Sequence, residues 1–109
     1  MIVVRITLNA LIEKQKELVQ TILSLIRSME KEAGCISYAF FCSVEDRNLL
    51  NLIAEWRTRK DLNKHFNSGM FGILMGTKTL LDTPMQVQIH TVSGTEGMEA
   101  VHSARNTIH

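Results

Sequence analysis

Apolar side chains along this chain recur with two periods, one typical of strands and one typical of helices. Residues 2–8 are rich in β-branched side chains, which favours a strand over a helix. Residues 36–44 and 49–56 are further runs of this kind, and the polar stretch between them predicts a turn. Residues 85–92 alternate apolar and polar side chains. We therefore expect strands in all these segments, with the second and third forming an antiparallel hairpin.

A long amphipathic helix is predicted between the first two strands. From Leu18 to Met29, apolar residues recur at steps of three and four, and charged residues are available for the solvent-facing side of the helix. Asn9 precedes this segment and is a residue type that favours the N-cap of a helix. Gly34 follows it, as a glycine at the C′ position commonly does. We expect the helix to lie between these two residues.

A second helical region is predicted between the third and fourth strands. Thr58 and Asp61 have the spacing of a capping box, which predicts that a helix begins at Thr58. Ser68 and Gly69 interrupt it, and residues 70–81 then form an apolar segment of helical length. Two glycines four residues apart weaken that segment by ~1 kcal/mol each relative to alanine. We attribute them to a close approach of another backbone.

The order of elements is β-α-β-β-α-β, which is the ferredoxin-like α+β arrangement with a four-stranded antiparallel sheet. This arrangement occupies residues 1–93, which we take as one domain. Residues 94–109 begin with a linker composition and continue as a polar segment, so we expect an exposed tail or a short surface helix.

Both faces of the predicted sheet carry apolar side chains. In this topology the two helices lie on one side and cover only one face. The other face would present an apolar patch larger than monomers normally expose. We therefore expect a homodimer, a dimeric α+β barrel, with a cleft for a small apolar ligand between each sheet and its own helices. One face carries Ile36, Tyr38, Phe40, Leu50, Leu52, Ala54 and Trp56, and the other carries Ala39, Phe41, Leu49 and Ile53.

The charge balance argues against several kinds of partner. The chain has 109 residues, which fits one domain, with 12 Lys and Arg against 11 Asp and Glu. No excess of positive charge is present to attract nucleic acid or an anionic membrane. The apolar N-terminal stretch is interrupted at Arg5 and falls far short of the ~18–20 residues of a membrane span. We expect a cytoplasmic protein that binds neither nucleic acid nor a membrane.

The cysteines and histidines do not suggest a metal site or a disulfide. Cys35 and Cys42 lie seven residues apart in one predicted strand, or about 23 Å, which is too far for a disulfide. Their odd spacing places them on opposite faces, and we expect two small buried hydrophobes. His90, His102 and His109 have no spacing that suits a metal ion. No glycine-rich phosphate loop and no Gly-x-Ser-x-Gly elbow occurs in the sequence.

Several residues together resemble a known family. Glu55 and Trp56 end the third strand, Thr58 begins the next helix, and His65 follows Trp56 by nine residues and precedes an apolar helix. With the order of elements, this pattern resembles the antibiotic-biosynthesis-monooxygenase-like proteins, which include quinol monooxygenases, over about residues 1–93. The resemblance implies a dimeric α+β barrel. For catalytic members it implies oxygenation of a small aromatic substrate, such as an anthrone or quinol, by O₂ with no metal, flavin or other cofactor.

Two alternatives to a monooxygenase stay open at this point. The first is a non-catalytic small-molecule-binding or regulatory dimer on the same fold. The second is an isomerase or a haem-degrading enzyme. Haem-degrading relatives hold haem with an Asn-Trp-His set, whose positions fall near Ile6, His65 and Met75 here, so the set is not reproduced.

Three residues are candidates for catalysis, since cofactor-free oxygenation needs a base of near-neutral pKa in a dry pocket. His65 titrates in this range and shares a helical face with Leu62, so it points toward the sheet as the candidate base. Trp56 is placed to stack on an aromatic substrate, and the Asn9 amide to hold a phenolic oxygen. Each has a structural alternative: a hydrogen-bonded core histidine, a core tryptophan and a helix cap.

Five further residues are candidates for substrate binding. Arg5 is a charge within the first strand that either pairs with a carboxylate such as Glu55 or orients an anionic intermediate, and we expect the pair. Tyr38, Phe71 and Met75 are placed to line the cleft, with core packing as the alternative role of each.

Overall fold

Four antiparallel strands form one sheet, as the sequence predicts. A computed structural model of the protein describes residues 1–107. The strands are β1 (Ile2–Asn9), β2 (Cys35–Cys42), β3 (Leu49–Trp56) and β4 (Gln86–Thr91). They pair in the order β2-β3-β1-β4, so that β3 and β1 lie in the centre of the sheet. This order is the ferredoxin-like arrangement and confirms the predicted α+β fold class.

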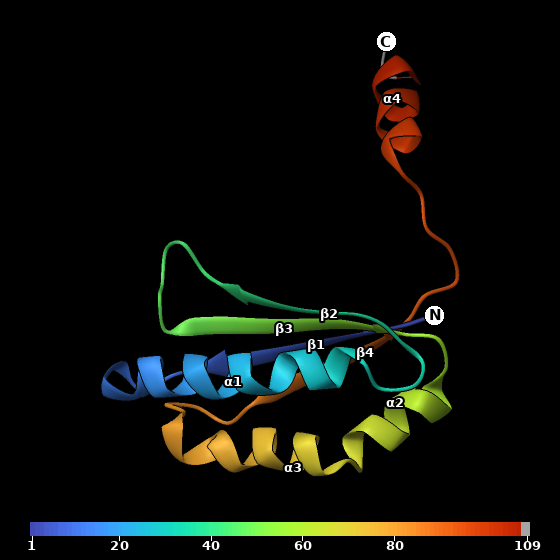
Figure 1. Ribbon diagram of the computed structural model, residues 1–109. Helices are drawn as coiled ribbons and strands as arrows, with labels where there is room; N and C mark the ends of the chain where they lie inside the picture. The colour runs from blue at the N-terminus through green and yellow to red at the C-terminus, as the bar shows by residue number, and fades with distance from the viewer. Residues whose placement is uncertain (108–109) are drawn as a thin grey trace.

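The helices between the strands cover one face of the sheet. They are η1 (Ile12–Lys14), α1 (Gln15–Glu30), α2 (Arg59–Phe66), α3 (Gly69–Met75) and η2 (Gly76–Leu80). Figure 1 shows α1, α2 and α3 on the same side of the sheet, whereas α4 (Met98–Thr107) stands away from it on the other side. Within residues 1–107, no helix is both long and apolar enough to cross a membrane.

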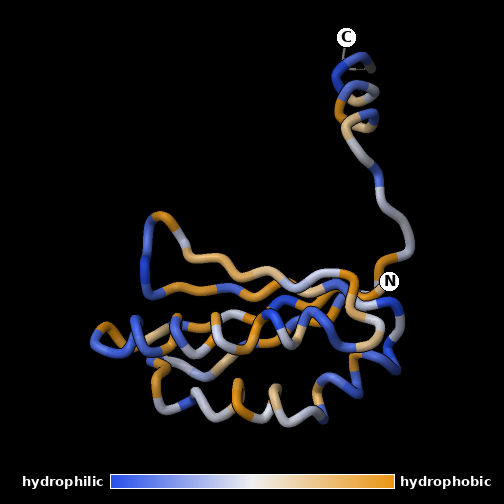
Figure 2. Tube along the Cα trace, viewed as in Figure 1, coloured by the Kyte–Doolittle hydropathy of each residue, from blue (hydrophilic) through white to orange (hydrophobic). Residues whose placement is uncertain are grey.

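The hydrophobic core lies between the sheet and these helices. Alternate residues of β1 and β3 are buried, and α1 contributes side chains at helical spacing. Figure 2 shows hydrophobic residues along the strands and at intervals along α1. Burial of each large apolar side chain contributes roughly 1.5–3 kcal/mol. The fully buried residues include Ile6, Leu8, Leu18, Ile22, Met29, Leu50, Leu52, Trp56, Leu62 and Leu74.

The face of the sheet away from α1 and α3, here called the open face, is less apolar than predicted. Arg5 and Thr7 of β1 both donate to the Asn51 side chain on this face, at 3.2 and 3.0 Å. Arg5 therefore makes no ion pair with Glu55 among the described residues, and that expectation is wrong. The open face also carries Val3, Ser37, Ala39, Phe41, Leu49, Ile53, Glu55, Gln86, Gln88 and His90, so apolar and polar side chains alternate there.

A bulge in β2 changes the faces of its first residues. The register shifts between Cys35 and Ser37, which leaves Ile36 47% exposed instead of in the core. Because of the bulge, Cys35 pairs with Trp56 and Cys42 with Leu50, so both cysteines lie on the helix-covered face, which corrects the prediction of opposite faces. Both are free, and Cys42 is exposed, so the expectation of two buried hydrophobes is also wrong for Cys42.

Two predicted helix boundaries are wrong. Asn9 is the last residue of β1 and caps no helix, because α1 begins only after the short helix η1. Its Nδ2 donates instead to Thr83 Oγ1 at 3.2 Å. Gly34 is not the C′ residue, since Lys31 is the C-cap of α1. Gly34 has a φ of +82° and an ideal Cβ there would lie 2.2 Å from Asp61 Oδ2, so the turn after α1 needs a glycine to approach α2.

The start of α2 is as predicted, and the segment after it is not. Thr58 Oγ1 accepts from the Asp61 amide at 3.1 Å, which confirms Thr58 as the N-cap. It also donates to Asp61 Oδ2 at 2.9 Å, so the Asp61 carboxylate bonds the Thr58 hydroxyl and not the backbone N–H of a full capping box. The helix predicted over 70–81 ends as α3 at Met75 and continues as η2. Gly72 and Gly76 have open space where a Cβ would lie, so the close approach we predicted there is wrong.

Candidate functional site

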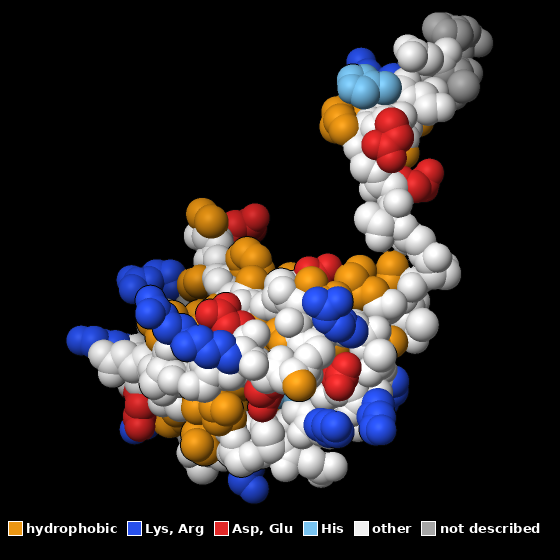
Figure 3. Space-filling view, turned by 45° about the vertical axis from the view of Figure 1, so that its right-hand side comes forward, with side chains coloured by type: hydrophobic (Ala, Val, Ile, Leu, Met, Phe, Trp, Pro, Cys, Tyr) orange, Lys and Arg blue, Asp and Glu red, His pale blue; other side chains and the backbone are white. Residues whose placement is uncertain are grey.

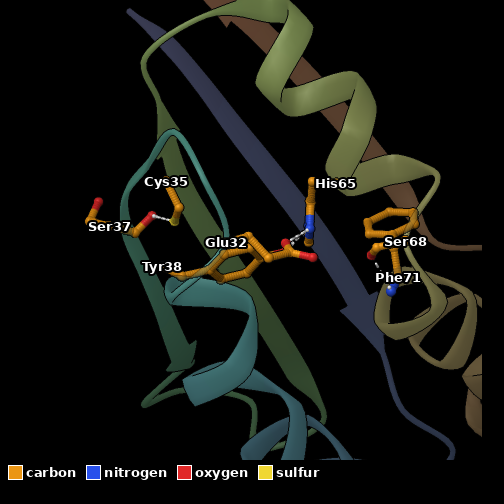
Figure 4. A network of polar contacts seen from close by, with 7 residues as sticks. All are labelled: Glu32, Cys35, Ser37, Tyr38, His65, Ser68 and Phe71. Carbon is orange, nitrogen blue, oxygen red and sulfur yellow. Dashed lines mark hydrogen bonds and ion pairs between the residues drawn. The ribbon is translucent and has the colours of Figure 1, made fainter.

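A buried polar network lies between α2 and the end of the sheet. Its centre is His65 in the last turn of α2, which is 2% exposed. Leu62 and His65 lie one turn apart on the face of α2 that packs on the sheet. Figure 4 shows Tyr38 from β2 and Glu32 from the turn after α1 directed toward the imidazole. Three separate elements therefore meet at this side chain.

Both imidazole nitrogens of His65 have a polar partner. Nδ1 contacts Glu32 Oε2 at a short distance, and Nε2 lies 3.1 Å from the Tyr38 hydroxyl oxygen. An ionised carboxylate only accepts, so Nδ1 carries the proton and donates to Glu32. In the neutral imidazole, Nε2 then accepts from the Tyr38 hydroxyl. The result is a chain of hydrogen bonds that runs Tyr38–His65–Glu32, here called the relay.

Aromatic rings hold the imidazole in place. The indole of Trp56 stacks on it with a centroid distance of 4.7 Å and an interplanar angle of 28°. Phe71 and Tyr38 meet it edge-on at 5.1 and 5.3 Å. The indole Nε1 of Trp56 is buried without a hydrogen-bond partner within the described part of the chain. The orientation of the imidazole is thus fixed by packing as well as by its hydrogen bonds.

The ionisation states follow from burial. Desolvation lowers the pKa of His65 below its usual value, and the nearby charge and hydrogen bond of Glu32 oppose this effect. Desolvation also raises the pKa of Tyr38, with smaller contributions from Cys35 and Glu32. At neutral pH the imidazole is therefore neutral and the phenol is protonated, in agreement with the hydrogen-bond directions above.

Cys35 lies beside the relay but is not poised as a nucleophile. Its thiol donates to the Ser37 carbonyl at 3.4 Å (Figure 4). Burial, followed by the charges of Glu32 and Glu30, raises the pKa of Cys35 to about 11. A thiol in this state is protonated at neutral pH and unreactive.

A small pocket opens on the relay from the outside. It has a volume of about 220 Å³ and is lined by Glu32, Ala33, Asp61, Lys64 and His65. The Glu32 side chain is 18% exposed and that of His65 is 1% exposed, so solvent reaches the relay at Glu32. The pocket is smaller than the ~300–1,000 Å³ of typical drug-sized sites. The interior between sheet and helices, where we expected the cleft, is occupied by the core side chains.

Four of the eight candidate site residues come together. His65, Trp56, Tyr38 and Phe71 form the core of the network described above. The other four, Asn9, Arg5, Glu55 and Met75, lie elsewhere. Arg5 and Glu55 are on the open face, where Glu55 accepts from the Ser37 hydroxyl at 2.6 Å, and Met75 is 57% exposed on α3.

Asn9 lies at the other end of the sheet. It pairs with Leu49, whereas Trp56 pairs with Ile2, so about 23 Å of strand separates Asn9 from the relay. Asn9 lines a separate pocket of about 320 Å³ with polar neighbours that include Asp82.

The histidines outside α2 are not grouped with metal ligands. Within residues 1–107, no three His, Cys, Asp or Glu side chains are arranged to hold a metal ion. His90 and His102 are exposed, and His109 lies outside the described residues.

Glu32 is the site residue that sequence reasoning missed. It is 33 residues from His65, and no spacing connects the two. The one signal available was its position two residues before Gly34, where the chain turns from helix to strand. A glycine with positive φ at that point lets the turn approach α2 and places Glu32 against the imidazole.

A family model matches two-thirds of the chain. Residues 1–73 match the family model described as antibiotic biosynthesis monooxygenase. An uncharacterised Synechocystis sp. protein, sll1783, is 27% identical over 85 residues, which are 77% of this chain and 58% of that protein. The chain thus spans little more than half the length of this curated relative.

Solved structures share the fold. A conserved protein from Methanosarcina mazei Go1 is 28% identical with a TM-score of 0.77, covering 82% of this chain and 89% of that one. Rv0793 from Mycobacterium tuberculosis is 21% identical with a TM-score of 0.81, covering 88% and 98%. A crystal structure of an antibiotic biosynthesis monooxygenase is 19% identical with a TM-score of 0.80, covering 86% and 100%.

Proposed function

Because the chain belongs to the antibiotic biosynthesis monooxygenase family, we propose that it is a cofactor-independent monooxygenase. Its substrate would be a small electron-rich aromatic molecule of the anthrone or quinol class, and O₂ would supply the oxygen atom. Such a reaction needs a base that removes a proton from the substrate and an environment that excludes water from the resulting anion. The proposal makes the relay and its pocket the place of this chemistry.

The observation that carries the proposal is the Tyr38–His65–Glu32 relay beside a pocket. A neutral imidazole held by a carboxylate is an effective general base, because the carboxylate stabilises the imidazolium that forms. Both Glu32 and His65 line the pocket, and Glu32 is the more exposed of the two, so a substrate proton would reach the pair at the Glu32 carboxylate. Uptake of one proton changes the charge of the pair from minus one to zero. When the proton resides on His65, the new charge of the imidazolium is compensated by the Glu32 carboxylate beside it.

The oxygen chemistry balances without a further reactant. A methylene carbon of an anthrone loses two hydrogens and gains one oxygen atom from O₂ as a carbonyl. The second oxygen atom leaves as water with those two hydrogens, and O₂ accepts the four electrons that the carbon loses. Lys64 lines the same pocket and offers a positive charge to the intermediate anion.

The roles of Trp56, Asn9 and Arg5 differ from the sequence hypothesis in this proposal. Trp56 stacks on His65 and fixes the plane of the base rather than holding the substrate ring. Asn9 and Arg5 lie away from the relay, so Lys64 takes over the stabilisation of the anion.

Oxygen consumption measured with a panel of anthrones and reduced quinols tests the proposal. Glu32→Gln and His65→Gln should each lower the enzyme-dependent rate by ~100-fold or more, the usual contribution of general acid–base catalysis. Glu30→Gln is the matched control, because it removes the same charge from an exposed site on α1. An equal rate in Glu32→Gln and Glu30→Gln, with both proteins folded, would rule the mechanism out.

A non-catalytic binding protein is the second candidate. It is favoured by the full occupation of both imidazole nitrogens, which leaves no free lone pair on His65 until a hydrogen bond breaks. Saturable binding of the same compounds without oxygen consumption would support this function over catalysis.

A homodimer is part of the proposal as well. Members of the family are typically dimers. Within residues 1–107 no helix lies over the open face, and Phe41 on it is 53% exposed. Two sheets facing each other across a two-fold axis would cover both open faces at once.

A further inference from the structure

The C-terminal segment, residues 93–107, stands clear of the body and is here called the arm. Figure 1 shows it rising from the end of β4 on the open-face side of the sheet, with α4 beyond the body. The radius of gyration is 16.4 Å, whereas a compact chain of this length has about 13 Å. The arm therefore does not pack as part of its own domain.

A helix such as α4 is not stable by itself in water. It has ten residues, and isolated helices shorter than ~12–15 residues are marginal. Met98 and Val101 lie on one side of it and are 62% and 45% exposed. His102 and Arg105 flank them on the same side, at helical spacing. This side has the composition of a contact surface, with an apolar centre and positively charged or titratable edges.

A complementary surface lies at the opposite end of the sheet. The loop between β2 and β3 (residues 43–48) also bends toward the open-face side. It carries Val44, which is 100% exposed, with the carboxylates of Glu45 and Asp46 beside it, and Phe41 precedes it on the open face. In Figure 3 hydrophobic side chains gather along the side of the body from which the arm rises.

We propose that α4 of one copy packs against the β2–β3 loop of a second copy, with Met98 and Val101 against Phe41 and Val44. When two sheets pack with their open faces together about a two-fold axis, a segment that projects from the open-face side of one copy meets a segment that projects from the open-face side of the other. The arm and the loop are the two elements that do so. Arm against loop places Arg105, on the same side of α4 as Met98 and Val101, near the carboxylates of Glu45 and Asp46, whereas Glu99 lies off that side of the helix.

The length of the linker fits an exchange between copies. Residues 93–97 span at most about 17 Å when extended. Packed sheets lie ~10 Å apart, so the linker crosses the interface and delivers α4 to the partner. This inference rests on the homodimer proposed above. It adds a second contact to that dimer, in which the arm of each copy packs on the other copy.

Trapping of a disulfide between copies tests the contact. Val101→Cys in one copy and Val44→Cys in a second, size-tagged copy are mixed in a full-length Cys35→Ala, Cys42→Ser background. Oxidation should give a cross-linked product of intermediate mass on a non-reducing gel. Ser103→Cys, on the opposite side of α4, is the matched control and should give at least tenfold less of it.

The dimer dissociation constant gives an independent readout. Val101→Asp should raise it at least tenfold in sedimentation experiments, whereas Ser103→Asp should leave it within twofold. A dimer that neither substitution weakens, without the mixed cross-link, would overturn the arm contact and leave the homodimer standing. A double variant, Val44→Cys with Val101→Cys, that cross-links only within one chain would also overturn it. A monomer at all concentrations would overturn both proposals.

Discussion

Removal of the Tyr38 hydroxyl isolates one bond of the relay. Tyr38→Phe keeps the ring, and therefore the contacts with His65 at 5.3 Å and Trp56 at 6.4 Å. It removes the hydroxyl oxygen that lies 3.1 Å from His65 Nε2, so this buried nitrogen loses its hydrogen-bond partner. A buried acceptor left unsatisfied costs about 1–3 kcal/mol, so we expect the free energy of unfolding to fall by this amount.

Urea unfolding at pH 8, where the imidazole is neutral, measures this loss. The slope of free energy against urea should not change, since the same surface is exposed on unfolding. The comparison variant is His65→Leu, which removes the partner of the hydroxyl. In that background the buried hydroxyl has already lost its partner, so Tyr38→Phe should be neutral or stabilising, giving a coupling energy of at least about 1–3 kcal/mol between the two side chains.

Additive effects of Tyr38→Phe and His65→Leu on the free energy of unfolding would contradict a hydrogen bond between the two side chains. A cost for Tyr38→Phe that is equal in both backgrounds would mean that the hydroxyl contributes through other contacts. A cost below about 0.5 kcal/mol in the wild-type background would mean that water or rearrangement satisfies Nε2. Either result would contradict a stabilising hydrogen bond between Tyr38 and His65.

Other predictions concern the turn, the helix start and the pH dependence of stability. Gly34→Ala should destabilise the protein by more than ~1–2 kcal/mol in chemical unfolding, because its φ is +82° and an added Cβ would meet Asp61, whereas Gly72→Ala, which faces open space, should not. Thr58→Ala should lose about 1 kcal/mol of stability with the loss of the cap, and a cost near zero would contradict the N-cap role of Thr58. The pKa of His65 is lowered by burial, so its contribution is complete above about pH 6.5 and is lost as the pH falls toward the folded-state pKa. Unfolding measured from pH 8 to 5 should show a slope of up to ~1.4 kcal/mol per pH unit that is absent in His65→Leu.

The sequence could predict those parts of the fold that depend on local pattern. Alternation in the strands and helical spacing from Leu18 to Met29 identified the elements and their order. The helix start at Thr58 was correct because the N-cap residue and the amide it bonds lie within one turn. His65 and Trp56 could be placed together because each lies on the apolar side of its own element.

The remaining features depend on contacts between distant segments. Glu32 reaches His65 only because the turn at Gly34 packs on α2. The spacing of apolar residues along the sequence does not predict a contact of this kind. The bulge at Ile36 inserts one residue into a regular strand, which changes the faces of Cys35 and Ile36, whereas the faces predicted for residues 38–41 are correct. Asn9 is of a residue type that suits a cap, but the strand pairing with Leu49 continues through it.

Oxygen-isotope labelling shows whether the carbonyl oxygen of the product comes from O₂. The protein is incubated with an anthrone under ¹⁸O₂ in unlabelled water, and the product is analysed by mass spectrometry. The account predicts one labelled oxygen in the new carbonyl, the other in water, and a rate that falls ~100-fold or more in Glu32→Gln but not in Glu30→Gln. An unlabelled product, or no enzyme-dependent product from any anthrone or quinol, would contradict it.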